Sequence, residues 1–93
     1  MSQVPAATRT LRVLSFLARQ PDPVPLERIM RACELPRSTA YHLLRVMVDE
    51  GFVVHLVDEG RYGLGPAAHE VGGGYARQAP LARIARRRCG ERR

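Results

Sequence analysis

The chain has 93 residues, of which 45% are hydrophobic, and a formal net charge of +6. This length allows one small domain with a single modest core. No apolar run approaches the roughly 20 residues that cross a membrane, and the first ten residues lack the apolar segment of a secretion signal. We therefore expect a cytoplasmic domain without a membrane partner.

The positive charge is concentrated at the C-terminus. Residues 77–93 hold seven arginines and one acid, which gives +6, whereas residues 1–76 hold eight arginines and eight acids, which gives zero. The high pI is therefore a property of the tail and does not by itself indicate that the folded part binds nucleic acid. Three interpretations of the tail stay open: a disordered solvated segment, an unspecific phosphate binder, or the remnant of an amphipathic linker helix.

Motifs of enzymes and metal proteins are missing from the sequence. It contains no HExxH, GxSxG or P-loop pattern, and the glycines at 72–74 lack the preceding strand of a phosphate-binding loop. Cys33 and Cys89 have no partners at metal-ligand spacing, so reduced thiols are expected. We predict no catalytic residue, no metal, no cofactor and no enzymatic activity.

The first helix is predicted from residue 8 to residue 19, after a flexible segment of residues 1–7. One apolar stripe has helical spacing and consists of Leu11, Leu14, Leu17 and Ala18. Val13 and Phe16 add a second stripe, so the apolar arc is wider than one core face requires. Either this helix is sunk deep in the core, or Val13 and Phe16 meet a second subunit in a dimer interface.

Two further helices follow a loop. Residues 20–25 contain three prolines, which a helix interior does not tolerate. A short helix is predicted from Pro25 to Cys33. After a tight connection, a third helix spans residues 36–50, with Pro36 in its first turn and Gly51 at its end.

The rest of the chain predicts a hairpin and a weak helix. Residues 52–57 and 61–64 have strand composition around a turn, so residues 52–64 form a two-stranded wing. Residues 66–79 are a linker helix that is interrupted by glycines and carries Val71 and Tyr75 as candidate dimer contacts. Residues 80–93 form the arginine-rich tail, where another helix could begin.

The predicted fold class is mostly α with a small β-hairpin. Three helices and a two-stranded wing over residues 8–65, followed by the linker helix, have the order of a winged helix-turn-helix. In that architecture the helix at 36–50 lies in the major groove of DNA, and its outward face meets bases and phosphates.

Three segments resemble the N-terminal region of the isocitrate lyase regulator (IclR) family of bacterial transcription factors. They are RTLRVLSFLA from Arg9, LERIMRACELPRSTAYHLLRVMVDEGFV from Leu26, and GRYGLG from Gly60. The resemblance extends to about Arg86. It implies binding to palindromic operators as a dimer or dimer of dimers, paired through the first helix and the helix after the wing.

The resemblance also implies a larger effector-binding domain, which we expect to begin near Pro80. Because the chain ends at Arg93, that domain is expected to be essentially absent, through excision or in a natural short form, and pairing is expected to be weak. The family commonly has glycine before LPRST, where this chain has Glu34. A left-handed turn is costly for glutamate, so the turn is either reshaped or strained.

The first turn of the third helix is a candidate phosphate site. Arg37, Ser38 and Thr39 lie where free backbone N–H groups favour an anion. Arg37 adds charge, and the two hydroxyls can donate hydrogen bonds. The structural alternative is ordinary capping of the helix by Ser38 or Thr39.

Tyr41, His42 and Arg45 lie one turn further along the exposed side of this helix. An arginine can contact guanine through two hydrogen bonds, worth about 1–3 kcal/mol of base discrimination. The alternative for Arg45 is a solvated side chain paired with Asp49. The alternative for Tyr41 is to fill the groove between helices.

In the wing, Arg61 is a candidate contact to a phosphate or the minor groove, although two acids at the turn oppose this. The sequence therefore predicts sequence-specific binding of double-stranded DNA, with helix 36–50 in the major groove and hairpin 52–64 as wing. The alternative is a winged-helix interaction module that pairs with full-length relatives and modulates them without contacting DNA.

Overall fold

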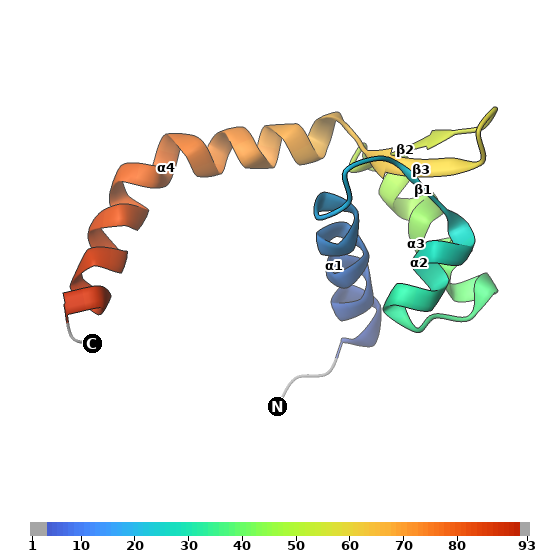
Figure 1. The fold of residues 1–93 in the computed structure, drawn as a ribbon, viewed down its shortest axis with the longest axis horizontal. Coiled ribbons are helices and arrows are strands. Elements are labelled where there is room, and N and C mark those ends of the chain that lie inside the picture. Colours follow the sequence, from blue (N-terminus) through green and yellow to red (C-terminus); the bar gives the residue numbers. More distant parts are fainter. Residues whose placement is uncertain (1–3, 92–93) are drawn as a thin grey trace.

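A computed structural model describes residues 4–91, and their side chains as far as residue 79. Figure 1 shows a body of three helices beneath a small sheet, and a long helix that begins beside the sheet and extends away from the body. The elements in chain order are α1 (Pro5–Ala18), β1 (Val24–Pro25), α2 (Leu26–Cys33), α3 (Arg37–Asp49), β2 (Val53–Leu56), β3 (Arg61–Leu64) and α4 (Pro66–Glu91). The predicted class, mostly helical with a winged helix-turn-helix, is confirmed.

One hydrophobic core joins α1, α2, α3 and the sheet. Helix α3 contributes Ala40, Leu44 and Met47, which recur at the predicted helical spacing. The buried residues are Val13, Leu17, Val24, Ile29, Leu35, Ala40, Leu44, Met47, Val53 and Tyr62. The core therefore fixes one face of α3 and leaves its opposite face to solvent.

Helix α1 begins earlier than predicted, at Pro5 instead of Thr8. Proline suits the first helical position because its missing N–H has no partner there, and the N–H of Thr8 already donates to the carbonyl of Val4 at 3.1 Å. Of the segment expected to be flexible, residues 1–3 lie outside the described residues. The Val13 side chain is completely buried, so it cannot meet a second subunit, and the prediction that it lies in a dimer interface is wrong.

The sheet has three strands, not the predicted two, in the order β1-β3-β2. Val24 lies opposite Tyr62 and Pro25 opposite Arg61, so the end of the predicted loop pairs with β3. Proline is tolerated because β1 is an edge strand that needs no donor on its outer side. Both α2 and α3 start one residue later than predicted, with Pro25 and Pro36 in extended conformation as their caps.

The turn between α2 and α3 keeps a left-handed residue in spite of its side chain. Glu34 has φ 56° and ψ 52°, and it is the one non-glycine residue with positive φ in the described part of the chain. The N–H of Leu35 donates to the carbonyl of Met30 at 2.9 Å and closes α2. The strained alternative therefore holds, at a cost of about 1–2 kcal/mol for an L-residue.

Helix α4 is continuous from Pro66 to Glu91, which corrects the predicted interruption at residues 72–74 and the predicted boundary at residue 80. Each glycine costs a helix about 1 kcal/mol relative to alanine, which weakens it without breaking it. Its start is fixed to the body, since the N–H of Ala67 donates to the carbonyl of Gly51 at 2.9 Å. A Cβ on Gly65 would lie 2.5 Å from that carbonyl oxygen, so this close approach requires glycine.

Candidate DNA-binding surface

The exposed face of α3 carries most of the predicted DNA contacts. Ser38, His42 and Arg45 are exposed on the side opposite the buried Leu44. The full predicted set lies on two elements: Arg37, Ser38, Thr39, Tyr41, His42 and Arg45 on α3, and Arg61 on β3. Thr39 is half-buried and the other six are exposed. One side of a rigidly packed helix thus presents cationic, hydroxyl and imidazole groups together.

The first turn of α3 has no side-chain cap. Pro36 occupies the cap position, its carbonyl accepts the N–H of Ala40 at 3.0 Å, and no side chain hydrogen bonds to the free N–H groups. The alternative in which Ser38 or Thr39 caps the helix is therefore not realised. These N–H groups and hydroxyls are available to an anion.

Arg37 forms an ion pair with the preceding helix. Its guanidinium donates to Glu27 Oε2 at 3.2 Å, and both side chains are about 60% exposed (62% and 61%). The pKa of Glu27 is lowered, first by a hydrogen bond with its own backbone and then by the bond from Arg37. No local sequence pattern predicts this pair, because the two residues belong to different helices.

Two hollows lie between α3 and the sheet. The larger, of about 540 Å³, is lined by Leu26, Arg37, Ser38, Tyr41, His42 and Tyr62. The smaller, of about 240 Å³, is lined by Tyr41, Arg45, Val48, Asp49, His55 and Tyr62. Tyr41 lines both and is 49% exposed, so it forms a wall between them and does not fill a gap in the core.

His55 is a surface residue that the sequence analysis left out of the site. Its ring stacks on Tyr62, with centroids 4.2 Å apart and planes at 4°, because the two residues face each other across β2 and β3. Tyr62 itself is buried, and burial raises the pKa of its hydroxyl, with Tyr41 adding to the shift. The register of the hairpin around its turn was the signal that could have placed His55 beside Tyr62.

Arg61 is separate from the α3 group. Neighbouring residues of a strand point to opposite faces, so Arg61 points away from the side that Tyr62 shares with α3. Its guanidinium donates to the carbonyl of Pro23 at 3.1 Å. The acids Asp58 and Glu59 are exposed in the adjoining turn. Asp49 and Arg45 line one hollow, yet no ion pair joins them among the residues the structure describes.

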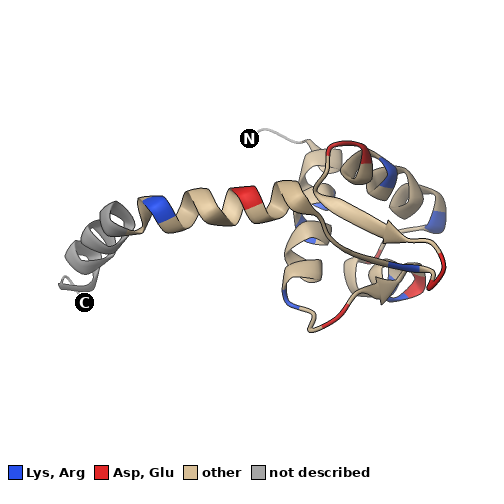
Figure 2. Ribbon diagram, turned by 90° about the horizontal axis from the view of Figure 1, so that it is seen from above, with Lys and Arg blue, Asp and Glu red and all other residues tan. Residues whose placement is uncertain are grey.

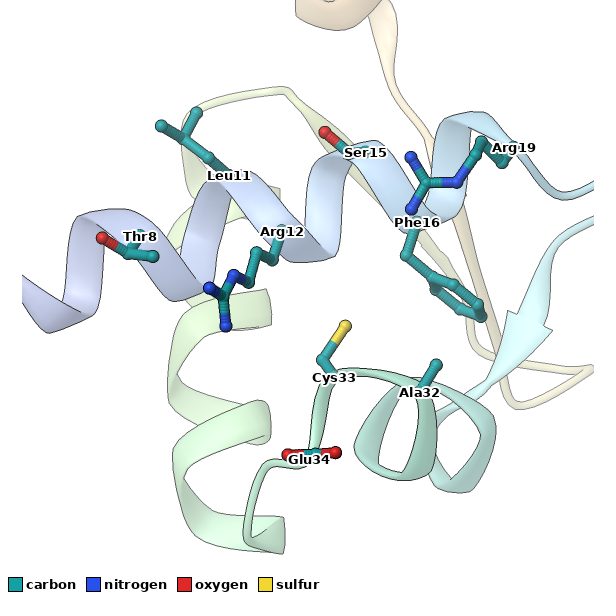
Figure 3. Close-up of a pocket in the computed structure, with 9 residues that line it drawn as sticks. All are labelled: Thr8, Leu11, Arg12, Ser15, Phe16, Arg19, Ala32, Cys33 and Glu34. Atoms are coloured by element: carbon teal, nitrogen blue, oxygen red, sulfur yellow. The ribbon is translucent and has the colours of Figure 1, made fainter.

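The remaining dimer candidates differ in exposure. Val71 and Tyr75 on α4 are 61% and 58% exposed, while Phe16 is half-buried against the core. Phe16 lines a groove of about 660 Å³ between α1 and the end of α2, where Figure 3 shows Cys33 directed at α1. Burial raises the pKa of the Cys33 thiol, against the opposing charges of Arg12 and Arg19.

Charged side chains are spread over the described part of the chain. Figure 2 shows acids and arginines spread over the body, and Glu70 and Arg77 on the described part of α4. Within that part, no three His, Cys, Asp or Glu side chains gather as a metal site. Nor does any of its helices combine the length and apolar character that a bilayer requires.

Comparison with known proteins places this surface in a family. The family model of the IclR helix-turn-helix domain matches residues 6–56, more than half of the chain. The chain belongs to the IclR family. The matched residues include all of α2 and α3 and all of α1 except Pro5, so the chain carries the DNA-binding domain of an IclR-type transcriptional regulator.

Individual IclR relatives agree with this assignment. The chain is 32% identical over 82 residues to the transcriptional repressor IclR of Escherichia coli (strain K12) and, equally, to the acetate operon repressor of Salmonella typhimurium. These matches cover 88% of this chain and 30% of each relative. The chain thus spans less than a third of the length of these relatives, both of which are named as repressors.

Solved IclR structures share the fold. An IclR regulator from Alicyclobacillus acidocaldarius matches with a TM-score of 0.73 and 30% identity, over 77% of this chain and 29% of that one. The repressor BlcR of Agobacterium tumefaciens matches with a TM-score of 0.69 and 29% identity, over 81% of this chain and 30% of that one. The predicted family and its winged-helix fold are confirmed.

Proposed function

We propose that this domain binds double-stranded DNA sequence-specifically, with α3 in the major groove and the hairpin of β2 and β3 as its wing. The observation that carries the proposal is the division of α3 into two faces. Leu44 and its neighbours are held in the core, so Ser38, His42 and Arg45 stand in line on a fixed outer face. A helix docked by its outer face can place such side chains against base edges.

The groups on this face divide by role. Arg37, Ser38 and Thr39 are assigned to phosphates, because they surround the uncapped helix start. Arg45 and His42 are assigned to bases, with Tyr41 beside them. Arg61 is assigned to the DNA backbone from the wing, once its hydrogen bond to Pro23 is exchanged for one to phosphate. The arginines of residues 77–93 would add affinity without sequence information.

We further propose that two copies bind a palindromic operator. Two-fold symmetry in the protein requires two-fold symmetry in the site, with half-sites about one helical turn or a multiple apart. Val71 and Tyr75 are large apolar residues exposed on the described part of α4, and Phe16 contributes its exposed part. Pairing between isolated chains is weak, so a tight dimer at nanomolar concentration in analytical ultracentrifugation would contradict this part of the proposal.

The test is selection of duplexes from a random library by the full chain at about 150 mM salt, a concentration that screens much unspecific binding. The best duplex is then compared with a scrambled one for the wild type and for Arg45→Ala. We expect Arg45→Ala to weaken the selected duplex by roughly 10- to 100-fold, since one bidentate base contact is worth about that much. Arg19→Ala, with the same loss of charge at the C-cap of α1, is the matched control.

Equal affinity of the wild type for both duplexes would refute sequence-specific binding. Unchanged binding of the selected duplex by Arg45→Ala would refute the assignment of Arg45 to a base. In the first case the affinity for DNA would belong to charge alone.

A further inference from the structure

Tyr62 has a polar group that packing in the core does not explain. The residue is 6% exposed and belongs to the core, yet its hydroxyl forms no hydrogen bond with any residue that the structure describes. Phenylalanine would fill the same place. In the described part of the chain no fully buried polar atom lacks a partner, so the small exposed part of Tyr62 includes its hydroxyl. The hydroxyl therefore reaches the surface and is open to a ligand.

The surface that the hydroxyl reaches is one of the two hollows between α3 and the sheet, since Tyr62 lines both. The larger hollow contains the first turn of α3 with Arg37 and Ser38, where the uncapped N–H groups favour an anion. The smaller one contains the carboxylate of Asp49 and no helix start. A negatively charged ligand therefore fits the larger hollow.

The rest of the larger hollow is apolar or aromatic. Leu26 from the start of α2, Tyr41 from α3 and the ring of Tyr62 line it, away from the cationic and hydroxyl groups of the first turn of α3. A ligand that combines an anionic end with a compact, weakly polar part matches this lining. The phosphate and deoxyribose of one DNA nucleotide have that combination.

The hollow also lies where bound DNA would pass. In a helix-turn-helix the second helix enters the major groove by its N-terminal residues, and the helix before it crosses the backbone. The starts of both helices, at Leu26 and Arg37, border the hollow. With α3 docked as proposed, the hollow faces the sugar-phosphate strand at the edge of the groove.

The ring of Tyr62 is held in one orientation. It lies on β3, the central strand of the sheet, between β1 and β2. His55 stacks on the ring, with centroids 4.2 Å apart and planes at 4°. A donor that is already fixed loses little side-chain freedom on binding, so more of the energy of its hydrogen bond appears as affinity.

We propose that this hollow seats one nucleotide of the DNA backbone and that the hydroxyl of Tyr62 donates a hydrogen bond to its phosphate. The phosphate lies at the start of α3, beside Arg37 and Ser38, and the deoxyribose lies against Leu26 and Tyr41. The inference rests on the proposed function and adds a binding residue to it. A phosphate contact carries no sequence information, so Tyr62 sets affinity and the position of the strand, whereas the outer face of α3 selects bases.

The first experiment measures binding of the full chain to the selected and the scrambled duplex over a range of salt. Tyr62→Phe removes the hydroxyl and keeps the ring in the core. Ser15→Ala removes an exposed hydroxyl from α1 and is the matched control. Thermal unfolding should be alike for the wild type and Tyr62→Phe, because the hydroxyl has no partner to lose within the described part of the chain.

We expect Tyr62→Phe to weaken both duplexes by a similar factor of roughly tenfold, the lower end for a hydrogen bond to a charged group. Its salt slope should equal that of the wild type, since a neutral hydroxyl releases no counterion. Arg37→Ala should instead lower the slope by about 0.9, the value for one neutralised phosphate. Ser15→Ala should bind both duplexes as the wild type does.

A second measurement locates the phosphate. Each phosphate of the selected half-site is replaced in turn by a neutral methylphosphonate, and each loss of affinity is taken relative to the unmodified duplex, so a change in the folded fraction cancels. At one position the loss should be smaller for Tyr62→Phe than for the wild type, because the two groups then no longer act independently. Ser15→Ala should follow the wild type at every position.

The inference is overturned if Tyr62→Phe binds both duplexes like the wild type, or if it weakens the selected duplex alone, which would indicate a base contact. Identical methylphosphonate profiles for the wild type and Tyr62→Phe would overturn it as well. Failure of the proposed function has a different signature, since the wild type would then bind the two duplexes equally. Tyr62→Phe would still report on the scrambled duplex in that case.

Discussion

Helix α3 buries Ala40, Leu44 and Met47 in the body, whereas α4 leaves Val71 and Tyr75 more than half exposed over its described part. Helix α3 has 13 residues and α4 has 26. The orientation of α3 is set by the core, which keeps its polar face ready for a ligand. The orientation of α4 is set at its start, against Gly51, and none of its described side chains belongs to the core.

The difference should appear most strongly in stability. Leu44→Ala removes a side chain that is 1% exposed, and we expect it to lower the free energy of unfolding by about 2–5 kcal/mol, as for other buried leucines. Val71→Ala on α4 should change it by less than about 0.5 kcal/mol, as at most surface sites. Urea unfolding of the monomer, followed by circular dichroism, measures both. Similar losses of unfolding free energy at the two positions would contradict the proposed difference between α3 and α4.

A second measurement addresses what α4 does with its exposed apolar residues. If Val71 and Tyr75 pair with a second copy, replacing both by alanine should weaken the dimer roughly tenfold or more, since a newly buried large side chain is worth about 1.5–3 kcal/mol. The stability of the monomer should change by less than this, because both side chains are more than half exposed. Sedimentation equilibrium gives the dimer constant, with Gln78→Ala as control on the same helix. An unaffected dimer would remove α4 from the interface.

A smaller effect concerns the turn that aims α3. Glu34→Gly should raise the free energy of unfolding by about 1 kcal/mol, because glycine adopts the left-handed conformation without a Cβ penalty. Glu34→Ala is the matched variant, since it removes the same charge and keeps the strain. Thermal unfolding of the two variants checks this. If alanine stabilises as much as glycine, the cause is charge and not backbone strain.

The comparison of α3 with α4 also explains how far the sequence could be used to predict the fold. The range 36–50 was close to the observed Arg37–Asp49, because every buried side chain of α3 follows helical spacing. Helix α4 has no such stripe, so its three glycines were given too much weight. Strand β1 was missed because Val24 and Pro25 lie in a proline-rich segment with loop composition, and their pairing with Tyr62 and Arg61 is a long-range contact.

The candidate site was predictable where it depends on one element. The exposed face of α3 follows from its buried face, so Ser38, His42 and Arg45 were placed correctly. The bond between Glu27 and Arg37 joins two helices across a turn, and no local pattern reveals it. Val13 was predicted to lie in a dimer interface, because a wide apolar arc in the sequence does not show which of its sides meets the core.

The short strand β1 has a consequence for association. An exposed strand edge invites another chain to add a strand, and the β-branched, apolar segment from Val53 to Leu56 would favour such growth. Here the edge of the sheet next to β3 is only two residues long, and Pro25 has no N–H to offer. At the opposite edge of the sheet, the start of α4 packs against β2. Aggregation by sheet extension is thereby suppressed.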